Sequence, residues 1–517
     1  MSPVQEPARA IDVVEMTVER AQAGFASGAF TSESLTEAFL DRIAVYNPPY
    51  NAIVFMNPTA LDDARSSDAR RASGKTLGPL DGVPVVVKDA MDMAGFPTTG
   101  GWRLLHGKTG GVDLHPATDA PVVARMRAAG SVILGKTNIP VLSATGSHAN
   151  DSWAGPTYNS AGREFLPGGS SAGTATAVGA SLAVLGLAEE TGGSIQNPAS
   201  AQGLVGIKPT FALVPNVGVL PLSGLRDVVG PIGRCVRDAA LALDALAGFT
   251  MADPKTVAGI GHKPPGGYAA GLKPDALRGK RIGTYGQGWR NLPLSEEATT
   301  LYRRALGEIE AQGAILVEDP FAGSGFADLR TPTVQGEEYD ARGLESLPYD
   351  LGKYLERLGP DAAIKTFAEF AAATKAEDPF APTGVLPYMS RLAEFNACLA
   401  DPTKPPDMSA FIALRERHLS IFNEVFARRR LDAAIFPQMR EQLAAREAKD
   451  IIHETTVSEI NIAGLPGVTV PAGAYASGSP FNLIAIGPQW SEAELLGIAF
   501  AYEQATRHRK APTLSHS

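Results

Sequence analysis

Cysteine is scarce in this sequence, which holds only Cys235 and Cys398 among its 517 residues. Two cysteines this far apart in the chain predict neither a disulfide framework nor a zinc site built from cysteines. A chain of this length buries a core large enough to fold without such staples. Because unpaired cysteines fit a reducing compartment, we expect a cytoplasmic protein.

The sequence is also short of positive charge and of long apolar runs. Its 46 Lys and Arg residues stand against 55 Asp and Glu residues, a net charge of −9, and the isoelectric point is about 5.5. A nucleic-acid-binding surface usually brings a basic stripe, so we expect no nucleic-acid partner. Residues 1–16 are interrupted by acidic side chains, and the longest weakly polar stretch, residues 172–188, ends at Glu189 and Glu190. Neither segment predicts a secretory signal or a membrane span.

Hydrophobic residues make up 44% of the sequence, and their pattern is that of an α/β protein. The β-branched runs at residues 83–88 and 131–135 predict buried strands. Residues 119–129, which lie between them, predict a helix. Strands and helices that alternate in this way indicate an α/β sheet.

The predicted secondary structure changes twice in the second half of the chain. Residues 329–445 are largely helical and contain their own proline-rich loop, so they are the best candidate for a cap-like insertion. Residues 457–484 return to strands and turns. The other predicted elements are helices at residues 11–23 and 34–45, the latter after a capping stretch at residues 31–33, and a strand at residues 281–285.

Residues 130–137, GSVILGKT, match the P-loop pattern letter for letter. A phosphate-binding loop lies between a strand and a helix that begins at its Lys-Thr pair. Here apolar Val132, Ile133 and Leu134 fill the loop, and Pro140 is a poor continuation of a helix. We therefore reject a nucleotide site.

Residues 169–173, GSSAG, match the nucleophile elbow of α/β-hydrolases, with Ser171 as the nucleophile. That elbow requires a buried strand that leads straight into the turn, whereas Pro167 and Gly168 are typical of a loop. None of the eight histidines stands in a setting that marks it as the base. A serine esterase that uses Ser171 is kept as an alternative.

A longer pattern, residues 167–210, contains this one. Its Gly-Gly-Ser-Ser loop opens a predicted helix of small residues at about 172–182, and a predicted strand at 184–188 ends in residues 189–194, EETGGS. A serine that follows two glycines at a strand end can present its hydroxyl beside bare backbone N–H groups, as an oxyanion hole requires. Most serines in glycine-rich segments, however, only form turns.

Taken whole, this segment resembles the signature of the amidase signature family, serine hydrolases that use a Ser–cis-Ser–Lys triad. Similarity to the family extends over residues 31–54, 78–101, 133–140 and 461–473 and the helix around Ala501-Tyr502-Glu503, and so over the chain except the cap region. The resemblance implies an α/β fold in which helices cover both faces of a central mixed β-sheet, with a helical cap-like insertion. It implies a single domain with these parts: N-terminal helices (1–70), signature core (71–250), core continuation (251–328), insertion (329–448) and C-terminal core (449–510).

The resemblance also assigns roles to residues of this sequence. Lys88 falls on the catalytic lysine, Ser170 on the serine with the cis peptide bond, and Ser194, 24 positions later, on the nucleophile. The oxyanion hole would be formed by the backbone N–H groups of Thr191, Gly192, Gly193 and Ser194. No metal or organic cofactor is implied, and the sequence offers no coherent set of ligands for one.

Lys88 must be neutral to act as a base, although a lysine in water is protonated at pH 7. The apolar residues 85–87 before it predict a desolvated amine, and desolvation lowers the pKa of a lysine. In the mechanism that the resemblance implies, Lys88 takes a proton from Ser194 through Ser170. Ser194 then forms an acyl-enzyme.

The sequence departs from the family pattern at three places. Ala172-Gly173 stands where a second Gly-Gly is common, and Ala is nearly as small as Gly. Glu190 stands where an aspartate is usual, and Gln196 stands where an arginine is usual. Because both halves of a supposed ion pair have changed together, we expect Glu190 and Gln196 to hydrogen-bond and support the oxyanion turn. The alternative is that both side chains face solvent.

We expect the substrate to be a small-molecule amide with an apolar or aryl group, and side activity on anilides, esters or carbamates. Ser143, Gly146 and Ser147 are candidates for the substrate pocket. Four aromatic residues of the insertion form either an apolar wall of the site or the insertion's own core: Phe367, Phe370, Phe380 and Tyr388. We expect a monomer or homodimer without a membrane partner. The rival function is an amidotransferase-type subunit that delivers ammonia to a partner.

Overall fold

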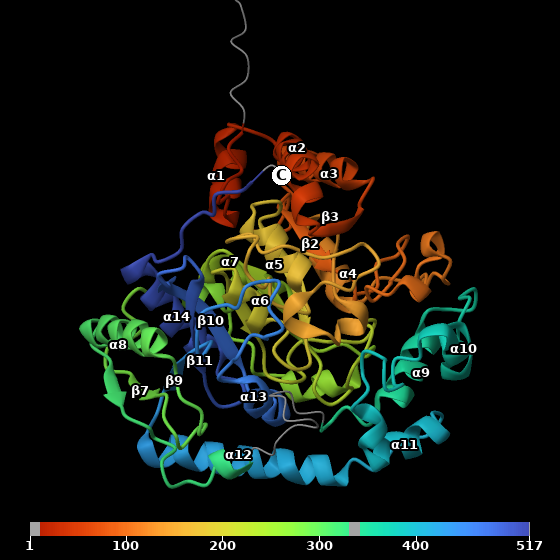
Figure 1. The fold of residues 1–517 in the computed structure, drawn as a ribbon. Coiled ribbons are helices and arrows are strands. Elements are labelled where there is room, and N and C mark those ends of the chain that lie inside the picture. Colours follow the sequence, from red (N-terminus) through yellow and green to blue (C-terminus); the bar gives the residue numbers. More distant parts are fainter. Residues whose placement is uncertain (1–10, 330–341, 516–517) are drawn as a thin grey trace, which may run out of the picture.

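The structure is a computed structural model that describes residues 11–329 and 342–515. In these residues, an 11-stranded mixed sheet runs in the order β1-β3-β2-β4-β6-β5-β10-β11-β9-β7-β8, with helices packed around it (Figure 1). The strands are β1 (Ile53–Met56), β2 (Pro84–Lys88), β3 (Val132–Thr137), β4 (Leu185–Glu190), β5 (Val205–Lys208), β6 (Val228–Gly233), β7 (Arg281–Thr284), β8 (Ile315–Val317), β9 (Ala433–Pro437), β10 (Gly467–Ala474) and β11 (Pro480–Ile486). The α-helices are α1 (Val18–Ser27), α2 (Ser32–Tyr50), α3 (Ala60–Ala72), α4 (Pro121–Ala128), α5 (Ala172–Gly179), α6 (Gln196–Ala201), α7 (Val236–Leu246), α8 (Glu296–Ala311), α9 (Leu347–Arg357), α10 (Phe367–Ala373), α11 (Ala393–Ala400), α12 (Ser409–Arg429), α13 (Val457–Ala463) and α14 (Glu492–Thr506).

Helices cover both faces of the sheet, as the alternating side chains of β6 demonstrate. Val228 and Ile232 pack into a cluster with residues of α5 and α6. Val229, which points to the opposite face, packs into the large core with residues of α7. This arrangement confirms the predicted α/β fold with a central mixed sheet.

The predicted strands at residues 83–88 and 131–135 are β2 and β3, which pair in parallel. All five side chains of β2 are buried, as expected of a short apolar strand inside an α/β sheet. The predicted helix between them is α4, which begins with Pro121 at a position that tolerates proline. Sequence periodicity was sufficient here because each element is short, apolar and bounded by turns.

The backbone of helix α5 lies close to the ends of β3 and β4, which explains the run of small residues in this helix. A Cβ added to Gly173 would lie 2.4 Å from the backbone nitrogen of Asn138. A Cβ added to Gly186 of β4 would lie 2.6 Å from Thr174 Cγ2. Larger side chains at these positions would push α5 away from the strands that carry the site.

The predicted helix at residues 11–23 is wrong in its first half, because α1 begins only at Val18. Thr17 caps this helix by accepting the N–H of Arg20. Val13 and Met16 are buried without being helical, so the apolar spacing marked burial rather than a helix. The second predicted helix, 34–45, is longer than expected, since α2 starts at Ser32 and continues to Tyr50.

Two secondary-structure assignments in the second half also need correction. The range 329–448, predicted as a helical insertion, includes α9 to α12 but also β9, which pairs with β11 and β7 in the central sheet. Its residues Ala433–Pro437 are all buried, and a short buried run looks alike in a helix and a strand. Conversely, Val457–Ala463, predicted as strand and turn, forms helix α13. Residues 1–10 and residues 330–341 of the predicted insertion lie outside the described residues.

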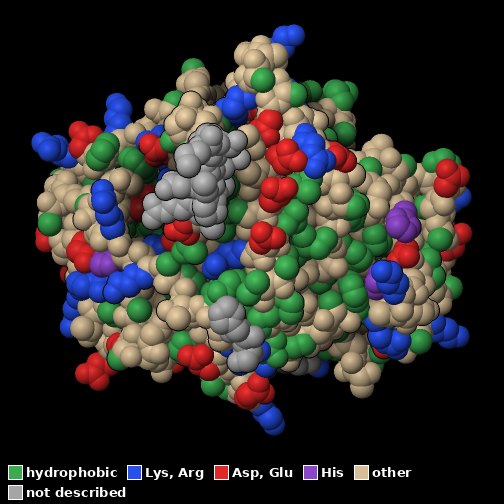
Figure 2. Space-filling view, turned by 90° about the horizontal axis from the view of Figure 1, so that it is seen from above, with side chains coloured by type: hydrophobic (Ala, Val, Ile, Leu, Met, Phe, Trp, Pro, Cys, Tyr) green, Lys and Arg blue, Asp and Glu red, His purple; other side chains and the backbone are tan. Residues whose placement is uncertain are grey.

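The surface mixes both signs of charge. On the face shown in Figure 2, Lys and Arg side chains are interspersed with Asp and Glu side chains and with apolar patches. Within the described ranges, no helix is both long and apolar enough to span a membrane.

Candidate active site

Lys88 is the last residue of β2 and is fully buried. Its Nζ lies 2.6 Å from Ser170 Oγ, 2.8 Å from Glu189 Oε2 and 3.2 Å from the Glu189 carbonyl oxygen. Strands β2 and β4 run in parallel with Val87 opposite Leu187, so the two strand ends meet. Burial lowers the pKa of Lys88 because the ammonium loses its water, while the charge of Glu189 acts in the opposite direction.

Ser170 reaches Lys88 from the loop that precedes α5. The peptide bond between Gly169 and Ser170 is cis, in line with the position that the sequence assigned to it. Gly169 leaves no room for a side chain, since a Cβ there would lie 1.9 Å from the Gly146 carbonyl oxygen. Its N–H donates to Asn197 Oδ1 at 3.1 Å, so the side chain of Asn197 ties this loop to α6.

Ser194 lies in the turn that joins β4 to α6 and is 7% exposed. Gly193 in this turn has φ +93°, and a Cβ there would lie 2.8 Å from Glu454 Oε2. The Ser171 N–H donates to the Ser194 carbonyl oxygen at 3.4 Å and so links the two serine segments. Among the hydrogen bonds of the described ranges, none joins the hydroxyls of Ser170 and Ser194, a contact that often tightens only when substrate binds.

Glu190 and Gln196 support this turn. Glu190 Oε1 accepts from Gln196 Nε2 at 2.7 Å, and Glu190 Oε2 accepts from the N–H groups of Ile195 at 2.8 Å and Gln196 at 3.1 Å. Both side chains are buried. The predicted hydrogen-bonded pair is therefore confirmed, and the alternative in which both face solvent is wrong.

Thr191 connects the turn to a second carboxylate. Its hydroxyl donates to Asp227 Oδ1 at 2.6 Å and lies 3.1 Å from Glu189 Oε1. Its carbonyl oxygen accepts from Arg226 Nε at 3.2 Å. Burial, together with the charge of Glu189, raises the pKa of Asp227 to about 7. The turn is thus anchored in a buried charged network beside Lys88.

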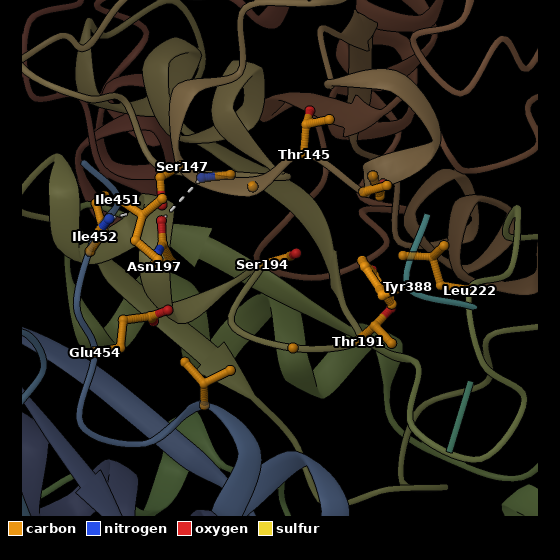
Figure 3. Close-up of a pocket in the computed structure, with 16 residues that line it drawn as sticks. Thr145, Ser147, Thr191, Ser194, Asn197, Leu222, Tyr388, Ile451, Ile452 and Glu454 are labelled. Carbon is orange, nitrogen blue, oxygen red and sulfur yellow. Dashed lines mark hydrogen bonds between the residues drawn. The ribbon is translucent and has the colours of Figure 1, made fainter. Parts of the chain in front are cut away.

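A cavity of about 150 Å³ lies in front of Ser194 (Figure 3). It is lined by residues that the sequence predicted for the site: Ser143, Gly146, Ser147, Thr191, Gly192 and Ser194. Lys88 and Ser170, which are buried, and Gly193 are not among its lining residues in the described part of the chain. The cavity therefore reaches the proposed nucleophile but not the amine behind it.

Sequence reasoning missed one wall of this cavity. In Figure 3, Ile452 and Glu454 lie on one side of Ser194, and Leu222 and Tyr388 lie on the other. The lining residues that were missed are Gly169, Asn197, Leu222, Ile451, Ile452, Glu454 and Val457. The one available signal for the last four was their position just before the family-like block 461–473.

The four aromatic residues of the insertion divide between two roles. Phe367 and Phe370 pack together with ring centroids 6.0 Å apart, and Phe380 packs on Phe395 at 4.9 Å. All three are buried in the large apolar cluster that also contains residues of the central sheet, and Phe370 packs on Trp102 of the core at 6.0 Å. Only Tyr388 of the four lines the cavity.

The elbow-like motif at Ser171 and the rejected P-loop-like motif lie away from this cavity. Ser171 is buried and its hydroxyl donates to the Glu189 carbonyl oxygen at 3.2 Å, away from the cavity lining. The P-loop-like residues form strand β3, and Lys136 pairs with Asp89 at 2.9 Å. Within residues 11–329 and 342–515, no group of His, Cys, Asp and Glu side chains is arranged to hold a metal ion.

With this geometry established, comparison with known proteins identifies the family. The family model for amidases matches residues 34–496. The chain belongs to the amidase signature family. A glutamyl-tRNA(Gln) amidotransferase subunit of Moorella thermoacetica is 34% identical over 493 residues, 94% of this chain and 95% of that protein. A probable amidase of Arabidopsis thaliana is 30% identical over 97% of this chain and 92% of its own length.

Solved structures of amidase signature enzymes share the fold. The peptide amidase of Stenotrophomonas maltophilia has a TM-score of 0.79 and 32% identity, over 98% of this chain and 99% of that chain. A bacterial aryl acylamidase of the same family has a TM-score of 0.77 and 25% identity, over 95% of this chain and 96% of that chain. The family and these neighbours make the protein an amide-hydrolysing enzyme of the amidase signature family.

Proposed function

We propose that this enzyme hydrolyses a carboxylic amide to an acid and ammonia or an amine through an acyl-enzyme on Ser194, with Ser170 relaying protons to Lys88. The observation that carries the proposal is the 2.6 Å contact of Lys88 Nζ with Ser170 Oγ beside a cavity that Ser194 lines. A serine hydroxyl is a weak nucleophile unless a base removes its proton. A buried lysine with a lowered pKa is suited to that task.

In the first half of the reaction, Ser194 Oγ bonds to the carbonyl carbon and its proton moves through Ser170 to neutral Lys88. The carbonyl oxygen becomes an oxyanion, which the N–H groups of Thr191, Gly192, Gly193 and Ser194 stabilise. The C–N bond then breaks, and Lys88 returns the proton through Ser170 to the leaving nitrogen. Water hydrolyses the acyl-enzyme by the same relay and restores Ser194.

The cavity supports an apolar or aryl-bearing acyl group. Leu222, Tyr388 and Ile452 give it apolar walls, and a volume of about 150 Å³ resembles that of an engineered cavity that binds benzene. Glu454 places a carboxylate in the wall, which disfavours an anionic acyl group through like-charge repulsion. The name of the aryl acylamidase neighbour fits an aryl-bearing amide, whereas the peptide amidase is named for a peptide amide.

Anilides, esters and carbamates each present an acyl carbon and a leaving group, so we propose side activity on them. A hydrolysis panel of aliphatic amides, aryl amides, anilides and carbamates tests the substrate class. Release of ammonia or amine from the apolar and aryl members, and its loss in Ser194→Ala, is the expected result. A panel in which every amide is stable, with protein that stays folded, would overturn the proposal.

The second candidate function is an amidotransferase-type subunit that delivers ammonia to a partner. The 34% identity to a protein named as such a subunit favours it. Two features favour a stand-alone hydrolase that is a monomer or homodimer. One is the long helical insertion, α9 to α12, and the other is the presence of Glu190 and Gln196 where the family usually has an aspartate and an arginine. We place this hydrolase in the cytoplasm, since Cys235 and Cys398 are free thiols.

A further inference from the structure

Glu189 is a buried carboxylate in the site to which the proposed mechanism gives no part. It is the next-to-last residue of β4 and is 1% exposed. One carboxylate oxygen lies 2.8 Å from Lys88 Nζ and its backbone carbonyl oxygen lies 3.2 Å from the same atom. The other carboxylate oxygen lies 3.1 Å from the Thr191 hydroxyl, so the Glu189 side chain sits between Lys88 and Thr191.

The three oxygens around Lys88 Nζ match what a base requires. A neutral amine has two N–H groups and one lone pair, whereas an ammonium has three N–H groups. If the two Glu189 oxygens accept the two N–H groups of the neutral amine, the lone pair is directed at the Ser170 hydroxyl, 2.6 Å away. After proton transfer, the third N–H of the ammonium donates to Ser170 and is ready to be returned.

We propose that Glu189 is a positioning residue that aims the Lys88 lone pair at Ser170 and stabilises the ammonium formed between the two halves of the relay. The inference rests on the proposed function, because Glu189 acts through Lys88. It extends that function, because it makes Lys88 and Glu189 a single proton-holding unit rather than an isolated amine.

The other charged groups around Lys88 do not duplicate this role. Glu190 and Asp227 also favour the ammonium of Lys88, but through space, and Glu190 is engaged with Gln196. Asp89, which follows Lys88, pairs with Lys136 at 2.9 Å. Among the described residues, the carboxylate that forms a salt bridge with Lys88 is that of Glu189.

The test is the pH dependence of Ser194 labelling by phenylmethylsulfonyl fluoride, which needs no knowledge of the substrate. Glu189→Gln keeps the shape and an acceptor oxygen but removes the charge. An opposite charge within 4–6 Å shifts a pKa by about 1–3 units, so we expect the midpoint of the labelling profile to move to lower pH by about that amount. Glu459→Gln is the matched control, because it removes a buried carboxylate from an ion pair with Arg290, 2.8 Å, elsewhere in the core. Its midpoint should equal that of the wild type.

A folded Glu189→Gln protein whose midpoint does not move overturns the role of Glu189. If Glu189→Gln fails to fold, Glu189→Met removes the charge with similar volume, and the same downward shift is expected. Glu189→Asp keeps the charge at shorter reach and should hold the midpoint while slowing labelling. Absence of Ser194 labelling in the wild type would instead refute the proposed function, so the two failures are distinguishable.

Discussion

Ser170 and Ser194 act at different points of the proposed relay, so their alanine variants should fail differently. Ser194→Ala removes the nucleophile, and no acyl-enzyme forms. Ser170→Ala keeps the nucleophile but breaks the link to Lys88, and general acid–base contributions of this kind are about 10²–10⁴-fold. We therefore expect Ser170→Ala to lose activity by about that factor and to keep a small residual rate, most visible on activated esters. Steady-state hydrolysis measures it.

A fluorophosphonate probe followed by mass-spectrometric mapping checks the assignment. The label should fall on Ser194, and Ser171→Ala, whose hydroxyl is buried against the Glu189 carbonyl, should keep its activity. A label on Ser171 would restore the esterase alternative. A label on Ser170 would mean that the roles of the two serines are exchanged.

The lowered pKa of Lys88 predicts how activity depends on pH. Its pKa is lowered by burial, and only the neutral amine accepts a proton. Below that pKa the amine is protonated, so kcat/KM should rise with pH and level off on the alkaline side. Lys88→Ala should abolish amide hydrolysis and harm a good-leaving-group ester less, since protonation of the leaving group matters less there. A wild-type profile that is flat from mildly acidic pH upward contradicts the lysine base.

At the scale of elements, the buried carboxylate of Asp92 in the core binds the C-terminal end of α9. Asp92 accepts from Arg357 Nη1 at 2.7 Å, from the Tyr354 hydroxyl at 2.8 Å and from Thr98 Oγ1 at 3.0 Å. Burial raises the pKa of Asp92 to about 6. Between the pKa of an unfolded aspartate, about 4, and this value the folded state holds the extra proton, so the contribution of Asp92 to stability falls as pH rises.

Removing Arg357 should therefore cost more at neutral than at acidic pH. At pH 7, Arg357→Ala leaves the buried Asp92 without its cation, which costs about 3 kcal/mol of unfolding free energy. At pH 5 Asp92 is protonated and the loss should shrink. Urea unfolding at pH 7 and pH 5 measures the two losses of unfolding free energy. Lys353→Ala on the same helix is the control, since Lys353 makes an exposed i,i+3 pair with Glu356 and a contact with the Tyr349 ring, and its loss should change stability little at either pH. Equal losses for Arg357→Ala at both pH values would contradict the account.

Elements could be predicted from the sequence where periodicity and burial agree. Strand β2 and helix α4 have both a clear pattern and clear boundaries. The pattern failed at Val13 and Met16, where apolar residues are buried without a helix, and at β9, whose partners β11 and β7 are distant in the sequence. Local sequence carries no information on such pairings.

At the scale of the whole molecule, the stand-alone function predicts an active single chain. The purified protein should hydrolyse amides without a partner protein, tRNA or ATP and elute from gel filtration as a monomer or homodimer. Ser194→Ala, purified in the same way, controls for contaminating amidases. Hydrolysis that appears only after a partner protein is added would favour the amidotransferase-type function.

The site could be predicted only as far as its motifs reach. Lys88, Ser170 and Ser194 lie in recognisable segments, and the pairing of Glu190 with Gln196 followed from their joint change. Glu189 stood out in the sequence only as the end of an apolar stretch, because its contact with Lys88 depends on the register of β4 against β2. Glu454 reaches the cavity from a loop that has no motif of its own.

The order of strands has a consequence for synthesis of the protein. Strands β10 and β11 lie between β5 and β9 in the sheet, although they are the last strands in the chain. A ribosome delivers the N-terminal part first, and that part can begin to fold first. Ser194 thus emerges roughly 250 residues before Ile452 and Glu454 of the cavity wall, and Lys88 and Ser170 emerge earlier still. The proposed nucleophile is therefore synthesised well before the cavity wall, and we expect no turnover until β10 and β11 have also been made.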